Sequence, residues 1–367
     1  MHKRPSKHGS SSSIDTTSST MSDSTNEFYS SNKFKLILLA GMVLQNSSVV
    51  LVGRYTNGGV PKEDRYVINH LIVVTEIGKL ILSCLFEHYT TNGQLMNSIQ
   101  ENIIKRPFDA LKITIPALLY LLQNTLLYVA LANLTAPLFQ VTYQGKLVTT
   151  AIISVLMLNR KYSPQQWICL VMLSLGVAVV VLDKPKEDEE DKADSVEQSM
   201  AKGLVAVSVA CCSSALAGVY FEKVIKTAGG KSKPVSVWMR NIQLAFFSII
   251  TAVFQGTISK DNDRPAGQPY LYGFTFWAWV LVMLQAGGGM LVAAVIKYAD
   301  NVLKGLATGV SVCVATGMSF LLFGTHISGQ FVAGAAVILT SVYFFSNPVK
   351  KAEKQKDISD TEKLLPK

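Results

Sequence analysis

The sequence is poor in charged residues, and most of those it has lie between long apolar runs. Asp, Glu, Lys and Arg together make up only 16% of the chain, against 49% for the hydrophobic residues, and the mean hydropathy is +0.30. This composition is too apolar for an ordinary soluble protein. We therefore expect a protein that crosses a membrane several times.

Cysteine and histidine are also scarce, with five of each. The cysteines, all inside apolar runs, show neither metal-ligand spacing nor a disulfide framework, and the histidines are scattered. The same runs contain few carboxylates, whereas a polytopic membrane enzyme needs paired carboxylates or a metal-ligand cluster. The pattern argues against an enzyme of this kind. It predicts no catalytic residue, no metal and no cofactor.

Ten apolar runs of about 20 residues are present, the length that spans a hydrocarbon core of about 30 Å as a helix. They are too long and too uniformly apolar for the strands of a barrel, so helices are expected. The predicted spans are 34–53, 67–87, 110–132, 136–159, 164–182, 201–223, 236–258, 274–297, 302–324 and 327–345. We predict an all-α polytopic membrane protein with ten transmembrane helices.

The polar segments divide the chain into five parts. Residues 1–33 are rich in Ser and Thr and lack the apolar core of a signal peptide, which predicts a disordered tail. The charged segment 183–200 separates two five-helix units, 34–182 and 201–347, and 348–367 form a second tail. Lys and Arg in the flanks favour the cytosol for both termini and the lumen for the charged loop. The net charge of +9 lies mostly in these flanks, so it does not indicate nucleic acid.

The two units resemble each other at a constant offset of 165 residues. Gly53 lines up with Gly218 and Ser154 with Ser319, and the span boundaries coincide throughout. Because five is an odd number, the second unit enters the membrane from the opposite side. The expected architecture is an inverted-topology pair that works by alternating access, with its site near the membrane midplane.

A single lysine, Lys146, interrupts residues 113–159, which otherwise contain no Asp, Glu, Lys or Arg. A cation inside an apolar helix is costly unless it lines a polar cavity, so it marks a candidate functional site. Tyr143, Lys146 and Thr150 lie along one stripe of the predicted helix. With no acid in this span or the one before it, an external anion is the favoured partner, and Glu76 is the internal alternative.

Two further polar clusters lie in the first unit. Glu76 and Lys79 share a helix face, so Lys79 either binds a ligand or is neutralised by Glu76. Tyr120, Gln123 and Asn124 form the other cluster. Their amides either bind the ligand or join neighbouring helices.

The candidates in the second unit lie mostly toward the ends of the spans. They are Ser214, Asn241, Gln243 and Lys297, while Arg240 and Lys304 are either site residues or flank charges. Gly288 and Gly289, in a run of three glycines, allow either a close helix contact or room for a bulky ligand. Lysines suit a phosphate, and amides and hydroxyls suit a base and sugars. The inferred ligand is a polar metabolite that carries phosphate.

Several motifs resemble the nucleotide-sugar transporter family. They include Gln123-Asn124, Val141-Thr142-Tyr143-Gln144-Gly145-Lys146, Gly218-Val219-Tyr220-Phe221-Glu222-Lys223, Arg240-Asn241-Ile242-Gln243 and Lys297-Tyr298-Ala299-Asp300-Asn301. The similarity covers about residues 34–348 and is to the branch that carries UDP-galactose, UDP-N-acetylglucosamine and CMP-sialic acid. It implies ten helices of the drug/metabolite transporter superfamily in the Golgi membrane. It also implies exchange of a cytosolic nucleotide sugar for a lumenal nucleoside monophosphate.

The resemblance also implies roles for individual residues. It places Lys79, Asn124, Ser214 and Asn241 near the nucleoside, and Tyr120, Lys146 and Lys297 nearer the ribose and phosphate. Whether Lys146 holds the phosphate or reaches the ribose, with Lys297 as the rival phosphate ligand, is left open.

The choice of substrate depends on departures from the family pattern. Ala245 stands where CMP-sialic acid carriers have Tyr, and residues 285–289 look more like the UDP-sugar carriers. We expect UDP-galactose in exchange for UMP, with UDP-N-acetylglucosamine or CMP-sialic acid as alternatives. A carrier of drug-like cations or amino acids is less favoured, because lysines outnumber acids in the middle of the spans. Membrane lipids are expected partners, and the sequence is compatible with an oligomer.

Overall fold

The computed structural model of the chain describes residues 32–57, 60–61, 64–182, 199–226, 235–258, 268–324 and 327–348. Every regular element within these ranges is a helix. The predicted tails, 1–33 and 348–367, and the predicted loop 183–200 lie outside the described residues apart from their edges.

Within these ranges ten helices are long and apolar enough to cross a membrane, so the prediction of ten transmembrane helices is confirmed. Their large exposed side chains, such as Leu156 and Leu321, are those of a lipid-facing surface. The long helices are α2 (Asn32–Asn57), α3 (Ile68–Thr90), α6 (Thr114–Asn133), α8 (Gly145–Leu158), α9 (Pro164–Leu182), α10 (Met200–Lys226), α11 (Val237–Ile258), α12 (Phe276–Tyr298), α13 (Asn301–Phe323) and α14 (Gly329–Ser346).

The remaining helices are short and lie around the third and fourth spans. They are α4 (Leu95–Ile99), the π-helix η2 (Gln100–Ile104), α5 (Pro107–Leu111) and α7 (Ala136–Tyr143). The third span starts at Pro107, earlier than predicted, and the fourth, predicted as one helix over 136–159, is divided between α7 and α8 at Gln144. Gly145 follows the break directly, and glycine favours such an interruption because it has the most backbone freedom to lose in a helix.

Polar residues at helix starts define several boundaries. Asp300 accepts a hydrogen bond from the Leu303 N–H at the start of α13, and Ser328 accepts one from the Phe331 N–H at the start of α14. Side chains of this type satisfy backbone donors that have no partner within the helix. The last span therefore begins two residues later than the apolar run alone predicts.

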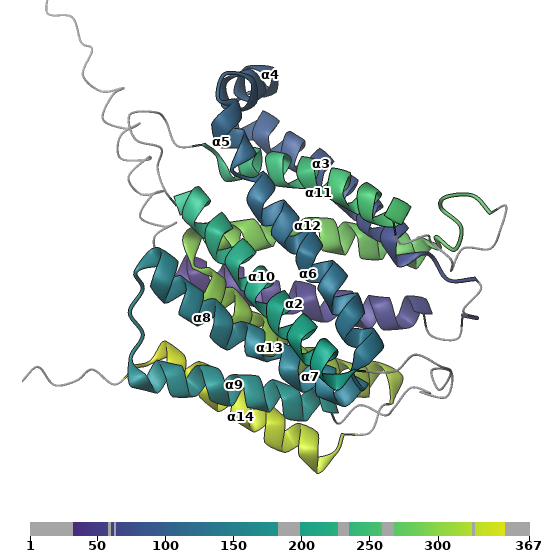
Figure 1. The fold of residues 1–367 in the computed structure, drawn as a ribbon, viewed down its shortest axis with the longest axis vertical. Helices are drawn as coiled ribbons and strands as arrows, with labels where there is room; N and C mark the ends of the chain where they lie inside the picture. The colour runs from purple at the N-terminus through teal and green to yellow at the C-terminus, as the bar shows by residue number, and fades with distance from the viewer. Residues whose placement is uncertain are drawn as a thin grey trace, which may run out of the picture.

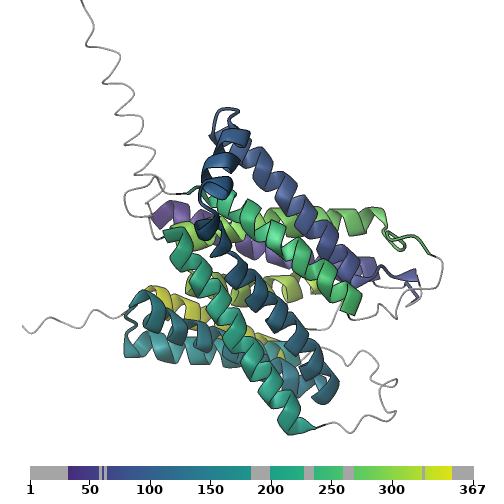
Figure 2. The same cartoon turned by 45° about the horizontal axis from the view of Figure 1, so that its top comes forward.

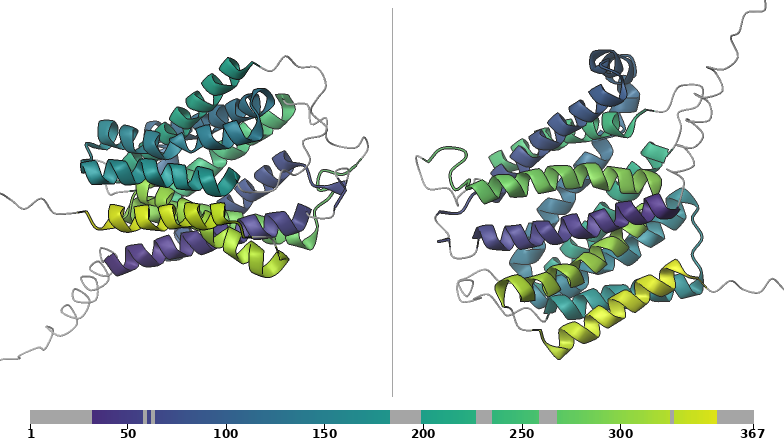
Figure 3. Two further views of the ribbon diagram at one scale, coloured as in Figure 1. Left: turned by 90° about the horizontal axis from the view of Figure 1, so that it is seen from below. Right: turned by 180° about the vertical axis from the view of Figure 1, so that it is seen from behind.

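The helices pack in pairs that join distant parts of the sequence (Figures 1 and 2). The helix α10 packs against α6 and α8, and α2 packs against α12 and α13. At one edge of the bundle α3 packs against α11, and at the other α9 packs against α14 (Figures 1 and 3). Elements from both halves of the sequence thus surround the centre of the bundle.

Candidate functional site

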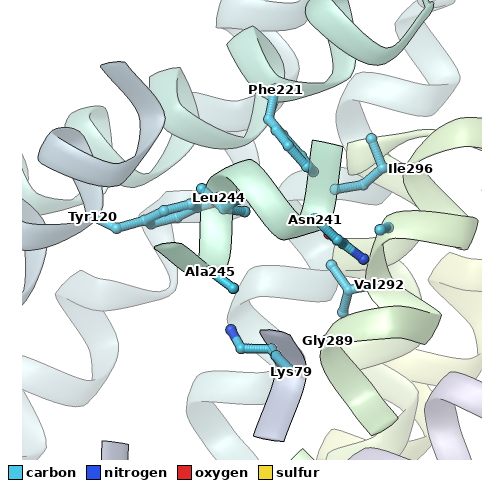
Figure 4. Close-up of a pocket in the computed structure, with 10 residues that line it drawn as sticks. Lys79, Tyr120, Phe221, Asn241, Leu244, Ala245, Gly289, Val292 and Ile296 are labelled. Carbon is cyan, nitrogen blue, oxygen red and sulfur yellow. The ribbon is translucent and has the colours of Figure 1, made fainter. Parts of the chain in front are cut away.

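A cavity of about 230 Å³ lies among α3, α6, α10, α11 and α12 (Figure 4). Four predicted site residues contribute to its lining, namely Lys79, Tyr120, Asn241 and Gly289. They come from four different helices, so only the tertiary structure brings them together. The other lining residues are Phe221, Leu244, Ala245, Val292, Ala293 and Ile296.

Lys79 is the cation of this cavity and has an internal partner. Its Nζ lies 2.6 Å from Glu76 Oε1, three residues earlier on α3. The two alternatives from the sequence are therefore compatible, because Lys79 is paired with Glu76 and also lines the cavity. Among the described residues, the second carboxylate oxygen of Glu76 has no hydrogen-bond partner. The pair thus retains acceptor capacity next to the cavity.

Two glycines of α12 allow close contacts with side chains of neighbouring helices, the first of the two purposes considered for them, whereas room for a bulky ligand stays a prediction. A Cβ atom added at Gly288 would lie 2.2 Å from Gln45 Nε2 of α2, so Gly288 permits a close helix contact. A Cβ atom added at Gly289 would lie 2.3 Å from Lys79 Cδ, so Gly289 leaves room for the lysine side chain at the cavity. A Cβ atom added at Gly287 would meet nothing within 4 Å.

The rest of the cavity is mostly apolar. Asn241 is buried, and its amide donates to Met290 Sδ over 3.5 Å. Phe221, Leu244 and Ile296 belong to the apolar wall. In the sequence these three residues are indistinguishable from ordinary apolar residues of a membrane span, so no signal there marks them as wall residues.

Lys146 does not line the cavity but is connected to it through Tyr143. Lys146 Nζ donates to the Tyr143 hydroxyl over 3.2 Å and lies 5.3 Å from the centre of the Tyr143 ring. The Tyr143 hydroxyl also accepts from Gln123 Nε2 over 3.4 Å, and Gln123 lies three residues after the cavity residue Tyr120 on α6. The suggested internal pairing of Lys146 with Glu76 is not seen, since Glu76 pairs with Lys79.

Thr150 and Ser214 are buried but do not line the cavity, and Asn124, one turn after Tyr120 on α6, is partly buried and also outside the lining. The Thr150 hydroxyl donates to the Lys146 carbonyl within α8. Lys297 is exposed, with its Nζ 5.0 Å from the Tyr298 ring centre, and it lies outside the cavity lining, so its role beside the phosphate stays a prediction.

Gln243 and Arg240 belong to a contact between α11 and the segment before α6. Arg240 Nη2 lies 2.6 Å from Asp109 Oδ2, and Arg240 Nη1 donates to Gln243 Oε1 over 3.0 Å. Gln243 Nε2 in turn donates to the Asn102 carbonyl over 3.3 Å. Arg240 is therefore a buried, paired cation rather than a free flank charge, and Gln243 lies outside the cavity lining.

A second charged cluster connects α8, α10 and the start of α13. The fully buried carboxylate of Glu222 binds Arg160 at 2.5 Å and Lys226 at 2.8 Å, and accepts from the Asn301 N–H over 3.0 Å. Arg160 also pairs with Asp300 at 2.8 Å. Glu222 and Asp300 belong to motifs shared with the family, but nothing in their sequence spacing indicates this cluster.

The charges of this cluster affect two groups beyond the end of α8. Burial alone would lower the pKa of Arg160, but the carboxylates of Asp300 and Glu222 outweigh it and raise that pKa. Burial, reinforced by the charge of Asp300, raises the pKa of Tyr162 to about 12. The guanidinium therefore stays charged and the phenol neutral over the physiological range.

In the part of the chain that the structure describes, ten helices can cross a membrane, and five of them line a cavity with a lysine, a buried amide and an apolar wall, as expected for a polytopic membrane carrier. The chain belongs to the nucleotide-sugar transporter family, whose model matches residues 30–346. Its function is thus nucleotide-sugar transport, and like its relatives it is a transporter rather than an enzyme.

Curated relatives carry two kinds of name. The UDP-galactose translocator of Mus musculus is 40% identical over 86% of this chain and 79% of its own length. The UDP-N-acetylglucosamine transporter of Homo sapiens is 38% identical over 87% of this chain and 97% of its own length. One crystal structure, 14% identical, matches with a TM-score of 0.60 over 86% of this chain and 97% of the other, which supports the fold alone.

Proposed function

We propose that the protein carries UDP-galactose across the Golgi membrane into the lumen and returns UMP to the cytosol. The proposal rests on relatives of this chain that are named for UDP-galactose or UDP-N-acetylglucosamine. Ala245, a cavity residue, stands where the resemblance puts a Tyr in CMP-sialic acid carriers, which favours a uridine nucleotide. UDP-N-acetylglucosamine is the alternative substrate, and CMP-sialic acid ranks below it.

The observation that carries the proposal is the position of Lys79 at the cavity between the two halves of the chain. Its cationic Nζ can neutralise an anionic ligand, the amide of Asn241 can bond to a base, and the apolar wall suits the faces of a base or sugar ring. We place Asn124, Ser214, Lys146 and Lys297 on the path of the ligand rather than in this cavity. Because Tyr143 bonds to Lys146 and to Gln123, three residues after Tyr120 on α6, a phosphate extending from the cavity would meet Lys146 next.

The proposed transport cycle uses two inverted five-helix units, 34–182 and 201–347. In this arrangement α10 is the counterpart of α2, α11 of α3, α12 of α6, and α13 of α8. With this assignment the helix contacts come in matched pairs. The contact of α6 with α10 matches that of α12 with α2, and the contact of α8 with α10 matches that of α13 with α2. This correspondence supports rocking of one unit against the other around a site near the midplane.

Charged contacts at opposite ends of α13 suggest how the two sides close. Asp300 binds Arg160 at the start of this helix, and Ser319 accepts from Arg54 over 2.6 Å near its end. With both termini in the cytosol, the Arg160 cluster closes the cytosolic side and the Arg54 contact closes the lumenal side. Exchange follows because a bound nucleotide favours the transition more than the empty cavity does.

The proposal is tested by transport into proteoliposomes that contain the purified protein. We expect UMP loaded inside the vesicles to stimulate uptake of labelled UDP-galactose, with less stimulation by CMP and less uptake of CMP-sialic acid. Lys79→Gln should abolish the stimulated uptake. The control is Lys33→Gln, which removes the charge of an exposed lysine at the start of α2 that does not line the cavity. Uptake that is indifferent to internal UMP would overturn the exchange model, and preference for UDP-N-acetylglucosamine would overturn the substrate order.

A further inference from the structure

The segment between α3 and α6, residues 95–112, carries exposed apolar side chains that its fold does not cover. Its helices α4 and α5 lie at one edge of the bundle, beyond α3 and α11 (Figures 1 and 3). Met96 is 75% exposed, Ile104 68%, Phe108 84% and Leu111 57%. So many large apolar groups on one short segment are unfavourable in water and indicate an interaction surface.

The same segment is basic on its exposed side. Lys105 and Lys112 are exposed and Arg106 is partly exposed, whereas Asp109 is bound by the buried Arg240. Glu101 is the other acid of the segment. Exposed apolar groups interleaved with Lys and Arg are typical of segments that lie in the headgroup layer of a membrane and attract anionic lipids.

The surface continues directly from the lipid-facing side of α3. Leu85, Phe86 and Tyr89, in the last turns of α3, are exposed large side chains, and the chain passes from them into α4 within a few residues. The segment links the second membrane span to the third and includes the first residues of the third span, from Pro107, so it lies where the chain re-enters the membrane. Position, apolar exposure and charge all fit a bilayer surface as the partner.

We propose that residues 95–112 form an interfacial segment that inserts Met96, Ile104 and Phe108 among the acyl chains and binds anionic lipid headgroups through Lys105 and Arg106. The inner side of this segment is attached to α11. Asp109 pairs with Arg240, and the Asn102 carbonyl accepts from Gln243.

A second contact ties the segment to the start of α11. Glu87, almost fully buried near the end of α3, accepts a hydrogen bond from Ser98 of the segment at 2.5 Å and another from Ser236, just before α11. Arg240 is next to Asn241, whose side chain lines the cavity. Binding of anionic lipid therefore positions the helix that supplies Asn241, and transport depends on the lipid.

The first test measures transport in vesicles of phosphatidylcholine with increasing phosphatidylserine. We expect phosphatidylserine to stimulate exchange. The double variant Lys105→Gln with Arg106→Gln should raise the fraction of phosphatidylserine needed for half-maximal stimulation about fivefold or more, since the loss of even one cation near an anionic surface weakens lipid binding about fivefold. The matched control, Lys33→Gln with Lys223→Gln, also removes two positive charges, from one lysine exposed at the start of α2 and one exposed near the end of α10. Equal loss of stimulation in both double variants, or none in either, would overturn the proposal.

The second test locates the segment directly. In the Phe108→Trp variant, the fluorescence gained over the wild type should be blue-shifted and quenched by lipids brominated on the acyl chains. A water-like emission that brominated lipids do not quench would overturn the insertion of Phe108. This readout depends neither on transport nor on the identity of the transported nucleotide, so it separates the lipid surface from the proposed function.

Discussion

Gly289 of α12 lies directly opposite the aliphatic part of Lys79 on α3. A Cβ atom at position 289 would lie 2.3 Å from Lys79 Cδ and 3.1 Å from Lys79 Cγ. The absence of a side chain at one position thus allows a cation from another helix to reach the cavity. This relationship connects the glycine run of α12 with the intramembrane lysine of α3, which the sequence presents as separate features.

The Gly289→Ala variant should transport with weaker apparent affinity. The flexible lysine can relieve the clash by changing rotamer, which moves Nζ away from its present position. Loss of a charged hydrogen bond to the ligand would raise KM about tenfold or more. Gly287→Ala makes the same change in helix propensity where the added Cβ meets nothing within 4 Å, and should keep a wild-type KM. Equal KM values for the two variants would contradict the proposed role of Gly289.

A double-mutant cycle should separate the role of Lys79 in ligand binding from its role as the ion-pair partner of Glu76. Lys79→Met leaves Glu76 as an unpaired, largely buried carboxylate and should lower Tm clearly, since breaking a buried pair costs about 3–5 kcal/mol. Adding Glu76→Gln should restore much of that Tm but no transport, because the cation at the cavity is still missing. Transport by the double variant, measured by UMP-stimulated uptake in proteoliposomes, would contradict a ligand role for Lys79.

Glu222 should be among the most sensitive charged positions for stability. Glu222→Gln removes the carboxylate that Arg160, Lys226 and the Asn301 N–H share, and should cost about 3 kcal/mol, the lower limit for breaking a buried pair. Its control is Lys112→Gln, which removes a pair with an exposed lysine and should cost less than about 1 kcal/mol. The Tm of both variants in detergent checks the order. Similar Tm values would show that the Glu222 cluster contributes little.

Tyr162 should make stability decrease at strongly alkaline pH. Its pKa is raised to about 12 by burial and by the charge of Asp300, whereas an unfolded tyrosine titrates near pH 10. The folded state thus holds this proton more tightly, so the contribution is intact below about pH 10 and is lost as the pH rises towards 12. Tyr162→Phe should flatten the decrease of Tm in this window. An unchanged slope would contradict the raised pKa.

The number and positions of the membrane helices were predictable from the sequence because each span must satisfy its own backbone hydrogen bonds in lipid. All ten predicted spans correspond to helices of the structure. The division of the fourth span at Gln144 was missed, since an apolar run does not reveal where neighbouring helices permit a break. The inverted repeat stays a prediction, supported by matched helix contacts.

The site was predictable only in part. Lys79, Tyr120, Asn241 and Gly289 meet at one cavity, as a polar intramembrane site requires. Gln243 instead bonds to Arg240 and the Asn102 carbonyl, because the segment before α6 folds back onto α11.

The sequence by itself determined that the chain crosses a membrane as ten helices, and it predicted that the few intramembrane lysines mark the site. Hydropathy, span length and the cost of a buried charge are local properties, so they can be read from a linear chain. Only the tertiary structure decided which lysine faces the cavity, which acids neutralise which cations, and which apolar residues form its wall. Those outcomes depend on helices distant in sequence, and the space that Gly289 leaves for Lys79 is the clearest case.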